Sequence, residues 1–318
     1  MKDPGRSLWN LAKVLGYLRS RTVEGDVYSL RNPWVLWKRS GTLEFTDGTR
    51  FPFQAENKTA IVNLAMFALD NGVRWGRDAG TWRIDPELRV VQTPSGLRFF
   101  AESVDPTIFT ETFLNDVHFV EFDLRGKVVV EGGAFVGDTA LYYAQKGATV
   151  YSFEPDPGSC ELARRNLELN PDLARSVVLR NWAIGRDGEV DFPVAARGSG
   201  GSTLAAPGAR SVRVRSVGIG TILSEFRLAD PYLLHLDIKG EEARVLEDES
   251  LARFQRLRIE YSSYLHAKNG GGDGSLRHML ERLDRLGFGD VRVFKHNRFR
   301  FDLRDHGTID ARRKITSA

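Results

Sequence analysis

Residues 126–139 read GKVVVEGGAFVGDT, and this stretch decides the fold. Residues 128–130 form a β-branched run, which predicts a central strand buried on both faces. The glycines that follow let a ligand approach the backbone closely, because a side chain would block it. An apolar helix is predicted from Thr139, and the N-terminus of a helix offers unpaired N–H donors and a partial positive charge. A strand, a glycine turn and a helix in this order predict a loop that binds a nucleotide.

The spacing of these glycines argues against a dinucleotide. A dinucleotide-binding loop follows the pattern G-x-G-x-x-G, in which the middle glycine admits the pyrophosphate. Here Gly133 and Gly137 follow the pattern G-x-x-x-G, and Phe135 fills the place of the middle glycine. Glu131 ends the strand, where a carboxylate would repel a diphosphate and attract an ammonium. S-adenosylmethionine carries an ammonium on its amino acid end, so we expect S-adenosylmethionine as the cofactor.

A second strand, residues 149–153, ends in Glu154. An acid there, about 20 residues past the glycines, is placed to accept the ribose hydroxyl protons of a bound nucleoside. The alternative is a solvent-exposed acid at a strand end. Asp156 and Pro157 predict the cap and first residue of a helix that runs to about Leu169. We expect Glu154→Ala to weaken S-adenosylmethionine binding by more than about tenfold with the fold intact, since a hydrogen bond to a charged group contributes ~1.5–3 kcal/mol.

A third strand, residues 177–180, runs into Asn181, Trp182 and Ala183. An amide and a small residue at this strand end can lie against an adenine, and Trp182 can either stack on it or pack in the core. Strands and helices alternate from residue 127 with short connections. That alternation predicts an α/β fold with a parallel sheet covered by helices on both faces.

Taken in order, these motifs resemble the FkbM-type family of S-adenosylmethionine methyltransferases. The usual run in that family is D-x-G-A-x-x-G-D, a strand ending F-E-P, then N-x-A, then K-x-D-x-E-G-x-E. The matching stretches are EGGAFVGD at 131–138, FEP at 153–155, NWA at 181–183 and HLDIKGEE at 235–242. The resemblance covers about residues 106–303.

The resemblance implies a Rossmann-like class I methyltransferase domain, with a seven-stranded, mostly parallel sheet and a C-terminal antiparallel hairpin. It also implies methyl transfer, commonly to a hydroxyl oxygen of a small molecule or a sugar. The residues expected to bind the cofactor are Glu131, Gly133, Ala134, Phe135, Gly137, Asp138, Thr139, Glu154, Pro155, Asn181, Trp182, Ala183 and Asp237.

Three positions depart from the family pattern. Glu131 replaces an aspartate and keeps its charge, His235 replaces a lysine, and Lys239 replaces the acid beside the glycine. The departures at His235 and Lys239 affect the predicted catalytic groups more than the predicted cofactor contacts.

The acceptor side is predicted at the end of a fourth strand, residues 232–237. In this architecture ligands bind in the crevice outside the strand ends. An alcohol acceptor must lose a proton, so a general base or a metal is needed nearby. Asp237, Glu241 and Glu242 are candidates for that base.

A fifth strand, residues 257–259, ends at Glu260, and His266 follows in a polar loop. Glu260 and Asp237 would stand at neighbouring strand ends and could hold a divalent cation. Lys239 between them would oppose a cation, and we expect no metal. His266 is either a base or a hydrogen-bonding surface histidine, so the candidate catalytic residues are Asp237, Glu241, Glu260 and His266.

The last part of the chain predicts a helix at 275–286 and a hairpin formed by residues 290–294 and 298–303. Such a hairpin is typical of methyltransferases and absent from the standard dinucleotide fold. An extra strand is expected at 210–216 after a connection rich in Gly, Ser and Ala at 195–206. Residues 268–274 form either a lid or an inert loop.

The first part, residues 1–105, is expected to be an α+β accessory region before a methyltransferase domain at 106–318. Helices are predicted at 8–18 and 58–69. Hairpins are predicted from strands 41–45 and 50–53 and from strands 89–92 and 97–100. None of these pieces carries a chemical motif.

The composition sets broad limits. The chain has 318 residues, 42% hydrophobic and 27% charged, an ordinary balance for a chain with a buried core. The single cysteine, Cys160, excludes an intramolecular disulfide and is expected to be a small buried residue. With no apolar run long enough for a membrane span and no signal peptide pattern, we expect a cytoplasmic protein.

The net charge is +3, from 45 basic and 42 acidic residues. The basic end at 311–314 is expected to be solvated, with an RNA or phospholipid contact as the alternative. A small-molecule or glycan acceptor is the leading expectation. Scarce clustered charge argues against an RNA methyltransferase. The Lys239 departure leaves a non-catalytic S-adenosylmethionine-binding module open.

Overall fold

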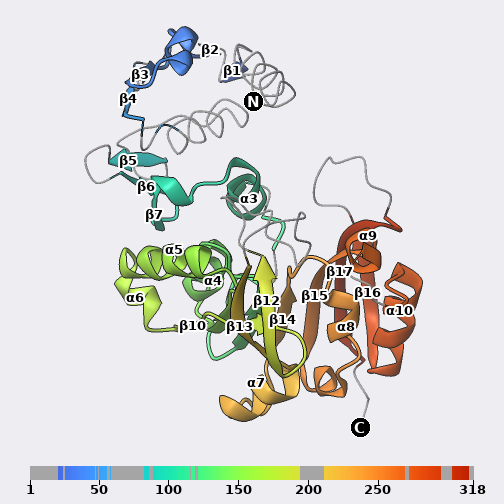
Figure 1. The fold of residues 1–318 in the computed structure, drawn as a ribbon. Helices are drawn as coiled ribbons and strands as arrows, with labels where there is room; N and C mark the ends of the chain where they lie inside the picture. The colour runs from blue at the N-terminus through green and yellow to red at the C-terminus, as the bar shows by residue number, and fades with distance from the viewer. Residues whose placement is uncertain are drawn as a thin grey trace. The chain divides into compact units, whose positions relative to one another are not determined.

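The computed structural model describes residues 21–23, 26–46, 48, 50–55, 58, 82–85, 89–114, 116–118, 121–193, 211–268, 272–294 and 303–314 (Figure 1). The chain divides into two compact units, Met1–Asp116 and Val117–Ala318. In the described parts, no helix is both long enough and apolar enough to cross a membrane.

The described part of the first unit contains short strands and short helical segments. Its strands are β1 (Arg21–Val23), β2 (Asp26–Tyr28), β3 (Gly41–Glu44), β4 (Arg50–Phe53), β5 (Arg83–Asp85), β6 (Val90–Gln92) and β7 (Arg98–Phe100). Its helical segments are η1 (Pro33–Trp37), η2 (Ala101–Ser103), α3 (Pro106–Phe109) and η3 (Thr110–Leu114).

Both predicted hairpins of this unit are confirmed. β3 pairs antiparallel with β4, and β6 pairs antiparallel with β7. Gly48 and Gly96 in the two turns have φ of +90° and +94°, which a glycine adopts without steric cost. The helix predicted at 8–18 lies outside the described residues, as does all but the first residue of the helix predicted at 58–69.

The second unit is built on a seven-stranded sheet in the order β10-β9-β8-β14-β15-β17-β16. The strands are β8 (Val128–Gly132), β9 (Thr149–Phe153), β10 (Val177–Arg180), β14 (Leu233–Leu236), β15 (Arg256–Ser262), β16 (Phe288–Phe294) and β17 (His306–Arg313). Neighbours are parallel except for β17, which is antiparallel to both β15 and β16. The predicted Rossmann-like architecture is therefore confirmed. The strand order reverses between β8 and β14, which places a ligand crevice at their carboxyl ends.

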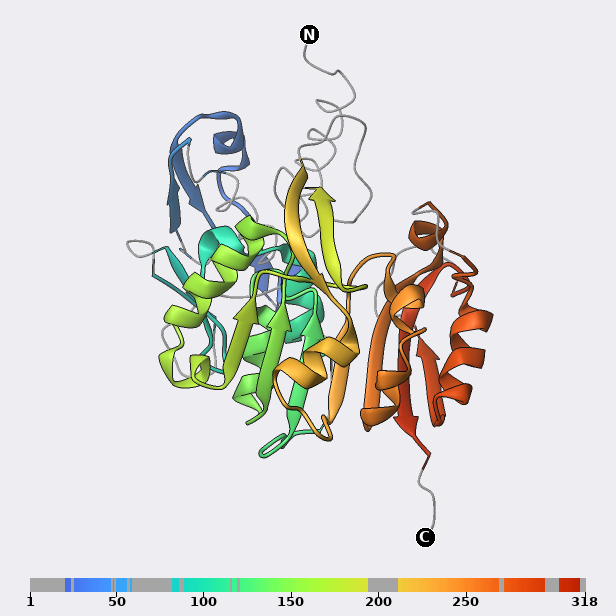
Figure 2. The same cartoon turned by 60° about the horizontal axis from the view of Figure 1, so that its bottom comes forward.

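Helices cover both faces of this sheet. They are α4 (Asp138–Gln145), α5 (Pro157–Glu168), α6 (Pro171–Ala174), α7 (Ile219–Glu225), α8 (Glu242–Val245), η4 (Glu249–Arg253), α9 (Ser263–Lys268) and α10 (Leu276–Arg285). On one face, α7, α8 and α10 pack their apolar side chains on β8, β14, β15 and β17, and Figure 2 shows α7 against the strands. On the other face, Tyr143 of α4 contacts the ring of His235 of β14. Cys160 of α5 is buried, as predicted.

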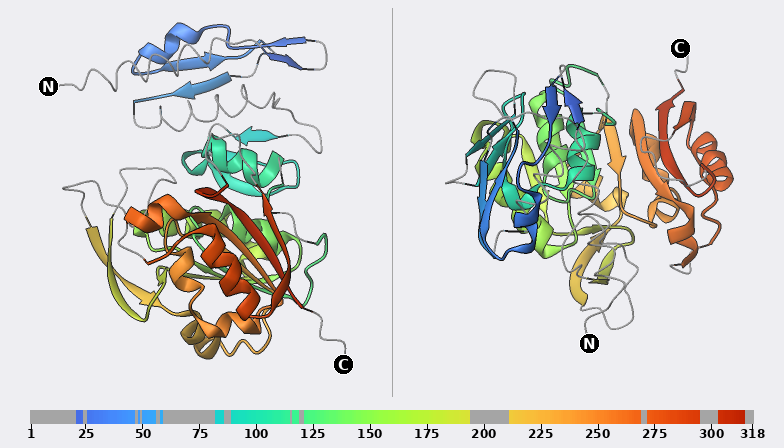
Figure 3. Two further views of the ribbon diagram at one scale, coloured as in Figure 1. Left: turned by 90° about the vertical axis from the view of Figure 1, so that its right-hand side faces the viewer. Right: turned by 90° about the horizontal axis from the view of Figure 1, so that it is seen from above.

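A small second sheet joins this unit in the order β11-β13-β12. Its strands are β11 (Ala183–Ile184), β12 (Gly188–Pro193) and β13 (Ser211–Val217), and β13 is the extra strand predicted at 210–216. In Figures 2 and 3, β12 and β13 project from the main sheet as a pair. The connection predicted at 195–206 lies outside the described residues.

The C-terminal hairpin is confirmed, but its second strand is not where the sequence predicted it. The return strand is β17, and of residues 298–303 only Leu303 is described, in a turn. The basic side chains of 311–314 are exposed, as expected for a solvated end, but residues 311–313 belong to β17, which lies between β15 and β16, and Ala311 is buried. Ile309 and Ala311 alternate with polar residues, and this period of two is the pattern of a strand.

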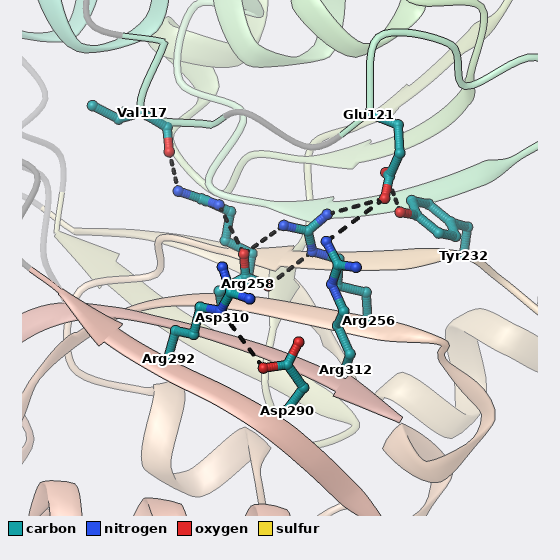
Figure 4. Close-up of polar contacts among 9 residues, drawn as sticks. All are labelled: Val117, Glu121, Tyr232, Arg256, Arg258, Asp290, Arg292, Asp310 and Arg312. Atoms are coloured by element: carbon teal, nitrogen blue, oxygen red, sulfur yellow. Dashed lines mark hydrogen bonds and ion pairs between the residues drawn. The ribbon is translucent and has the colours of Figure 1, made fainter. Parts of the chain in front are cut away.

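One face of the main sheet carries a row of polar side chains across six strands. In register from β9 to β16, the row contains Ser152, Glu131, His235, Arg258, Asp310 and Arg292. Residues paired across neighbouring strands share a face. The row therefore links the strand that precedes the glycine turn with the charged cluster drawn in Figure 4.

That cluster ties the segment before β8 to the sheet (Figure 4). Arg256 donates to Asp310 from Nε at 2.8 Å and lies 3.5 Å from Glu121. Arg258 donates to the backbone carbonyl of Val117, and Tyr232 donates to Glu121. The two guanidiniums are almost fully buried and share the Asp310 carboxylate. Their charge is thus satisfied by Asp310 and by the segment that enters the domain.

Candidate functional site

The glycine turn lies at the carboxyl end of β8, and its backbone is shaped by close packing. Gly133 and Gly137 have φ of +89° and +78°, and Phe135 also adopts a positive φ of 46°. A Cβ on Gly133 would lie 2.1 Å from the backbone oxygen of Asp237, and one on Gly137 would lie 3.3 Å from the Cβ of Ala163. Glycine is therefore favoured at both positions by the positive φ, and at Gly133 also by the lack of space for a Cβ.

Four N–H groups of this turn donate to acceptors within the protein. Gly133 and Ala134 donate to the carbonyl of Phe153 at 2.9 and 3.1 Å, and Gly137 donates to Ala134 at 2.7 Å. Phe135 donates to Oε2 of Glu154 at 2.8 Å. A loop that binds a diphosphate directs such donors at the phosphates. In this turn, the N–H groups of Gly133, Ala134 and Phe135 are instead hydrogen-bonded to acceptors at the end of β9.

Glu154 is the residue that holds the turn to the second strand. Its Oε1 accepts the N–H of Asp156 at 2.9 Å, and its Oε2 accepts the N–H of Phe135. Each carboxylate oxygen retains a further lone pair. Burial raises the pKa of Glu154 to about 7. The solvent-exposed alternative is excluded, because the side chain is buried.

Glu131 lies deeper than a strand-end position. It is inside β8 and fully buried, and Ser152 donates its hydroxyl to Oε2. Its Oε1 has no hydrogen-bond partner among the described residues. Burial raises the pKa of Glu131 to about 8, and the charges of Asp138, Glu154 and Asp237 act in the same direction. Asp138, Glu154 and Asp237 are therefore close enough to Glu131 for their charges to oppose its ionisation.

The remaining residues predicted to contact the cofactor make contacts within the protein. Asn181 donates its amide to the carbonyls of Glu154 and Pro155 at 2.8 and 3.0 Å, so it fixes the strand end. Trp182 stacks on Phe153 with ring centroids 5.8 Å apart, and it packs against the core. Ala183 begins β11. Asp138 and Thr139, both buried, open α4 behind the turn.

On the acceptor side, Asp237 is ion-paired. Lys239 lies 3.2 Å from its Oδ1 and 3.5 Å from its Oδ2, and both side chains are about three-quarters covered. Asp237 raises the pKa of Lys239, with Glu260 and Glu242 adding to the effect. Lys239 has a positive φ of 49°. Its ammonium therefore lies near the carboxylates of Asp237, Glu242 and Glu260.

Glu241 and Glu242 differ in environment. Glu241 pairs with Arg244 at 2.6 Å, one turn along α8. Glu242 is buried, and its two oxygens accept the N–H of Gly240 at 3.1 and 2.9 Å. Burial raises the pKa of Glu242 to about 8. Of the two, Glu242 belongs to the acid-rich centre.

Two predictions about the fifth strand are wrong in detail. Glu260 lies inside β15 and not at its end, since the strand continues to Ser262. His266 is neither in a polar loop nor on the surface. It lies in α9, is buried, and its Nδ1 is 3.0 Å from the carbonyl of Gly240. It therefore supports the loop that carries Lys239.

His306 is a site residue that the sequence analysis missed. Its Nε2 lies 3.8 Å from Oε1 of Glu260, and its Nδ1 lies 3.1 Å from the hydroxyl of Ser262. The signal was the strand pattern of β17, which places His306 opposite Ser262. In the described part of the chain, no group of three or more His, Cys, Asp or Glu residues could hold a metal ion.

Comparison with known proteins gives one family. The family model for the methyltransferase FkbM domain matches residues 131–289, half of the chain. No curated protein matches the sequence.

Several solved structures resemble the chain. Fibrillarin from Aeropyrum pernix, with natively bound S-adenosyl-L-methionine, is 13% identical over 86% of this chain and 94% of that chain, with a TM-score of 0.39. The magnesium protoporphyrin IX methyltransferase from Synechocystis PCC 6803 is 13% identical over 64% of this chain and 78% of that chain, with a TM-score of 0.40. Precorrin-6y C5,15-methyltransferase from Geobacter metallireducens is 14% identical over 66% and 90%, with a TM-score of 0.36.

Proposed function

The chain belongs to the methyltransferase FkbM domain family, and from this premise we propose that it transfers a methyl group from S-adenosylmethionine to an oxygen of a sugar, a lipid headgroup or another small metabolite. The acceptor would meet the cofactor in the crevice beyond β8, β14 and β15.

The observation that carries the proposal is the internally satisfied turn. Gly133, Ala134 and Phe135 donate their N–H groups to the end of β9, so they are not directed at a phosphate. Gly133 carries no side chain, and the backbone oxygen of Asp237 fills the space that a Cβ would take, so the turn packs directly against the residue that follows β14. A nucleoside without a diphosphate fits such a turn better than a dinucleotide does.

Charge supports the same ligand. The buried carboxylates of Glu131, Glu154 and Asp237 act on one another, and burial raises the pKa values of Glu131 and Glu154 to about 8 and about 7. A ligand with a sulfonium and an ammonium would supply the missing positive charge. We propose that Glu154 accepts the ribose hydroxyls with its remaining lone pairs and that Glu131 and Asp237 face the cationic end.

S-adenosylmethionine, when bound, supplies an activated methyl group on sulfur. The protein must hold the acceptor oxygen in line with that methyl, and much of the acceleration of such a transfer can come from positioning. It must also take the proton of the acceptor hydroxyl. Asp237 is engaged with Lys239. We therefore assign proton acceptance to Glu260, with His306 beside it to take the proton onward.

Lys239 has two consequences under this proposal. Its ammonium can stabilise the negative charge that develops on the acceptor oxygen, as oriented cations do at other developing oxyanions. Its pairing with Asp237 also gives the specific observation that favours a second candidate, a module that binds the cofactor without catalysis.

Titration calorimetry tests cofactor binding. We expect S-adenosylmethionine and S-adenosylhomocysteine to bind and NAD to give no heat. Binding of NAD at the affinity of S-adenosylmethionine would remove the proposal.

Labelled methyl transfer to a cell extract then identifies the acceptor class. Incorporation that survives ribonuclease supports a small-molecule or glycan acceptor, whereas incorporation lost with ribonuclease supports an RNA methyltransferase. Cofactor binding without incorporation into any fraction supports the non-catalytic module.

We also propose that residues 1–105 form an accessory region to a methyltransferase domain at 106–318. The single buried cysteine suits a cytoplasmic location, where thiols stay reduced.

A further inference from the structure

Two tryptophan side chains in the first unit are exposed to solvent. Trp34 and Trp37 are 60% and 59% exposed. The other exposed large apolar side chains among the described residues are Phe122 and Tyr264, both in the second unit. Trp34 and Trp37 share one short helical turn, η1. A pair of exposed indoles on one turn is a feature of binding surfaces.

The turn that carries them is fastened to the hairpin β3–β4. Asn32, just before η1, donates its amide to the carbonyl of Thr42 at 2.8 Å and accepts the N–H of Glu44 at 2.9 Å. Between the tryptophans, Val35 is 6% exposed and packs so closely that a Cβ on Gly41 would lie 2.5 Å from it. The η1 turn is therefore fixed on its inner side.

The geometry of the turn directs both indoles outward together. In a 3-10 helix, residues three apart lie one above the other. Trp34 and Trp37 are three apart, and Val35 between them points to the hairpin. The two rings thus form one exposed surface on a fixed base, which lowers the entropy that a partner must remove on binding.

The surroundings of this surface are basic. Arg31, Lys38 and Arg39 are exposed, and residues 27–43 contain no Asp or Glu. The next acid along the chain, Glu44, is paired with Arg50 at 3.1 Å. The segment therefore combines two exposed indoles with three exposed basic side chains and has no acidic residue of its own between positions 27 and 43.

We propose that this tryptophan surface (Trp34, Trp37, Lys38 and Arg39) docks the protein on an anionic lipid bilayer. Indole rings partition to the interface between headgroups and acyl chains, where an apolar body and a polar N–H are both satisfied. Basic side chains beside them are attracted to anionic headgroups. The bilayer is favoured over a single-stranded nucleic acid, because stacked bases need rings spread along a groove that follows the backbone. This proposal does not depend on methyl transfer.

Cosedimentation with vesicles tests it on the full chain. We expect binding to equimolar phosphatidylcholine and phosphatidylglycerol vesicles at low salt, and weak binding to phosphatidylcholine alone. Trp34→Ala/Trp37→Ala should lower the partition coefficient by about tenfold or more. Lys38→Gln/Arg39→Gln should lower it by roughly 30-fold, since each basic side chain near an anionic surface contributes about fivefold.

Matched control variants distinguish vesicle binding by this surface from non-specific adsorption. Phe122→Ala removes an aromatic ring that is 84% exposed in the second unit. Arg164→Gln/Arg175→Gln removes the same charge from exposed positions on α5 and after α6. Both controls should bind vesicles as the wild type does, and circular dichroism should show that every variant is folded.

Three results would overturn the proposal. The first is no binding of the wild-type chain to either vesicle. The second is equal binding by the tryptophan variant and the wild type. The third is that the tryptophans are needed instead for binding a single-stranded RNA oligomer or for self-association in analytical ultracentrifugation, while vesicle binding is absent.

Discussion

Gly133 and Asp237 touch across the two central strand ends, so closely that a Cβ on Gly133 would lie 2.1 Å from the backbone oxygen of Asp237. The contact joins the loop after β8 to the loop after β14. These two loops also bracket the point at which the strand order reverses. The backbone at residue 133 thus determines how closely the two loops approach each other.

Replacing Gly133 tests this contact. Gly133→Ala should destabilise the protein by at least about 3 kcal/mol, because alanine at positive φ costs about 1–2 kcal/mol and the clash with backbone adds to it. Gly126→Ala is the control, because Gly126 has a φ of +73° with nothing within 4 Å of the added Cβ. Denaturant unfolding compares the two. Equal losses would mean that the contact with Asp237 has no effect.

Glu154 should couple cofactor affinity to the shape of the turn. Glu154→Gln should weaken S-adenosylmethionine binding by more than about tenfold, since a hydrogen bond to a charged group contributes ~1.5–3 kcal/mol. Glu154→Ala should lower stability more than Glu154→Gln does, because alanine leaves the N–H groups of both Phe135 and Asp156 without an acceptor, whereas glutamine keeps one oxygen for one of them. Calorimetry measures affinity, and exposed Glu161→Gln on α5 serves as the control. Unchanged affinity in Glu154→Gln would remove Glu154 from the cofactor site.

The raised pKa of Glu131 predicts how stability varies with pH. Burial moves this pKa from 4.5 to about 8 in the folded protein. A carboxyl with a raised folded pKa contributes stability that is fully present below the unfolded value and lost as pH rises through the folded value. The free energy of unfolding without ligand should therefore fall from about pH 5 to about pH 9, and Glu131→Gln should make that fall smaller. Denaturant titrations over this range measure it. An identical slope in the variant would contradict the assignment.

The same carboxyls predict that cofactor binding releases protons. A cationic ligand favours the ionised forms of Glu131 and Glu154, whose pKa values are about 8 and about 7. Affinity for S-adenosylmethionine should rise from about pH 6 to about pH 7.5, below the range in which its α-amino group deprotonates. Calorimetry in buffers with different ionisation enthalpies measures the released protons. A binding heat that does not depend on the buffer would exclude this linkage.

Asp310 should be essential for the stability of the sheet. Its carboxylate forms ion pairs with Arg256 and Arg258, whose side chains are only 5% exposed. Asp310→Asn should cost about 3–5 kcal/mol, because it leaves buried positive charge without its partner. Asp290→Asn is the control, because its pair with Arg292 at 3.6 Å is exposed and should contribute about 0–1 kcal/mol. Thermal unfolding distinguishes them, and similar melting temperatures would contradict the role of the buried cluster.

The parts of the fold that depend on local chemistry could be predicted from the sequence. The strand β9 and the strand β10 have the predicted bounds, and Asp156 caps α5 by accepting the N–H of Ser159 at 2.7 Å. The two strands were predicted from short apolar runs, and the helix cap was predicted from residues within one turn of the chain. The parallel sheet covered by helices followed from the alternation of strands and helices.

The polar interior could not be predicted, because it depends on pairing between distant strands. Charged residues at 256 and 258 made β15 look three residues long, whereas their partner Asp310 lies more than 50 residues later. Likewise, Glu131 meets Ser152 and His235 only through the register of β8 with its neighbours. His306 remained hidden for the same reason, since its place opposite Ser262 follows from the pairing of β17.

The position of β17 has a consequence for biosynthesis. This strand separates β15 from β16, yet both leave the ribosome before it does. Until residue 313 has emerged, the nascent domain has two open strand edges with a gap between them, and such edges are prone to pair wrongly. Arg256 and Arg258 are also synthesised before Asp310, so they lack their acidic partner during that interval. Closure of the sheet is therefore a late event in the life of each new chain, and a chaperone that shields strand edges would act in that window.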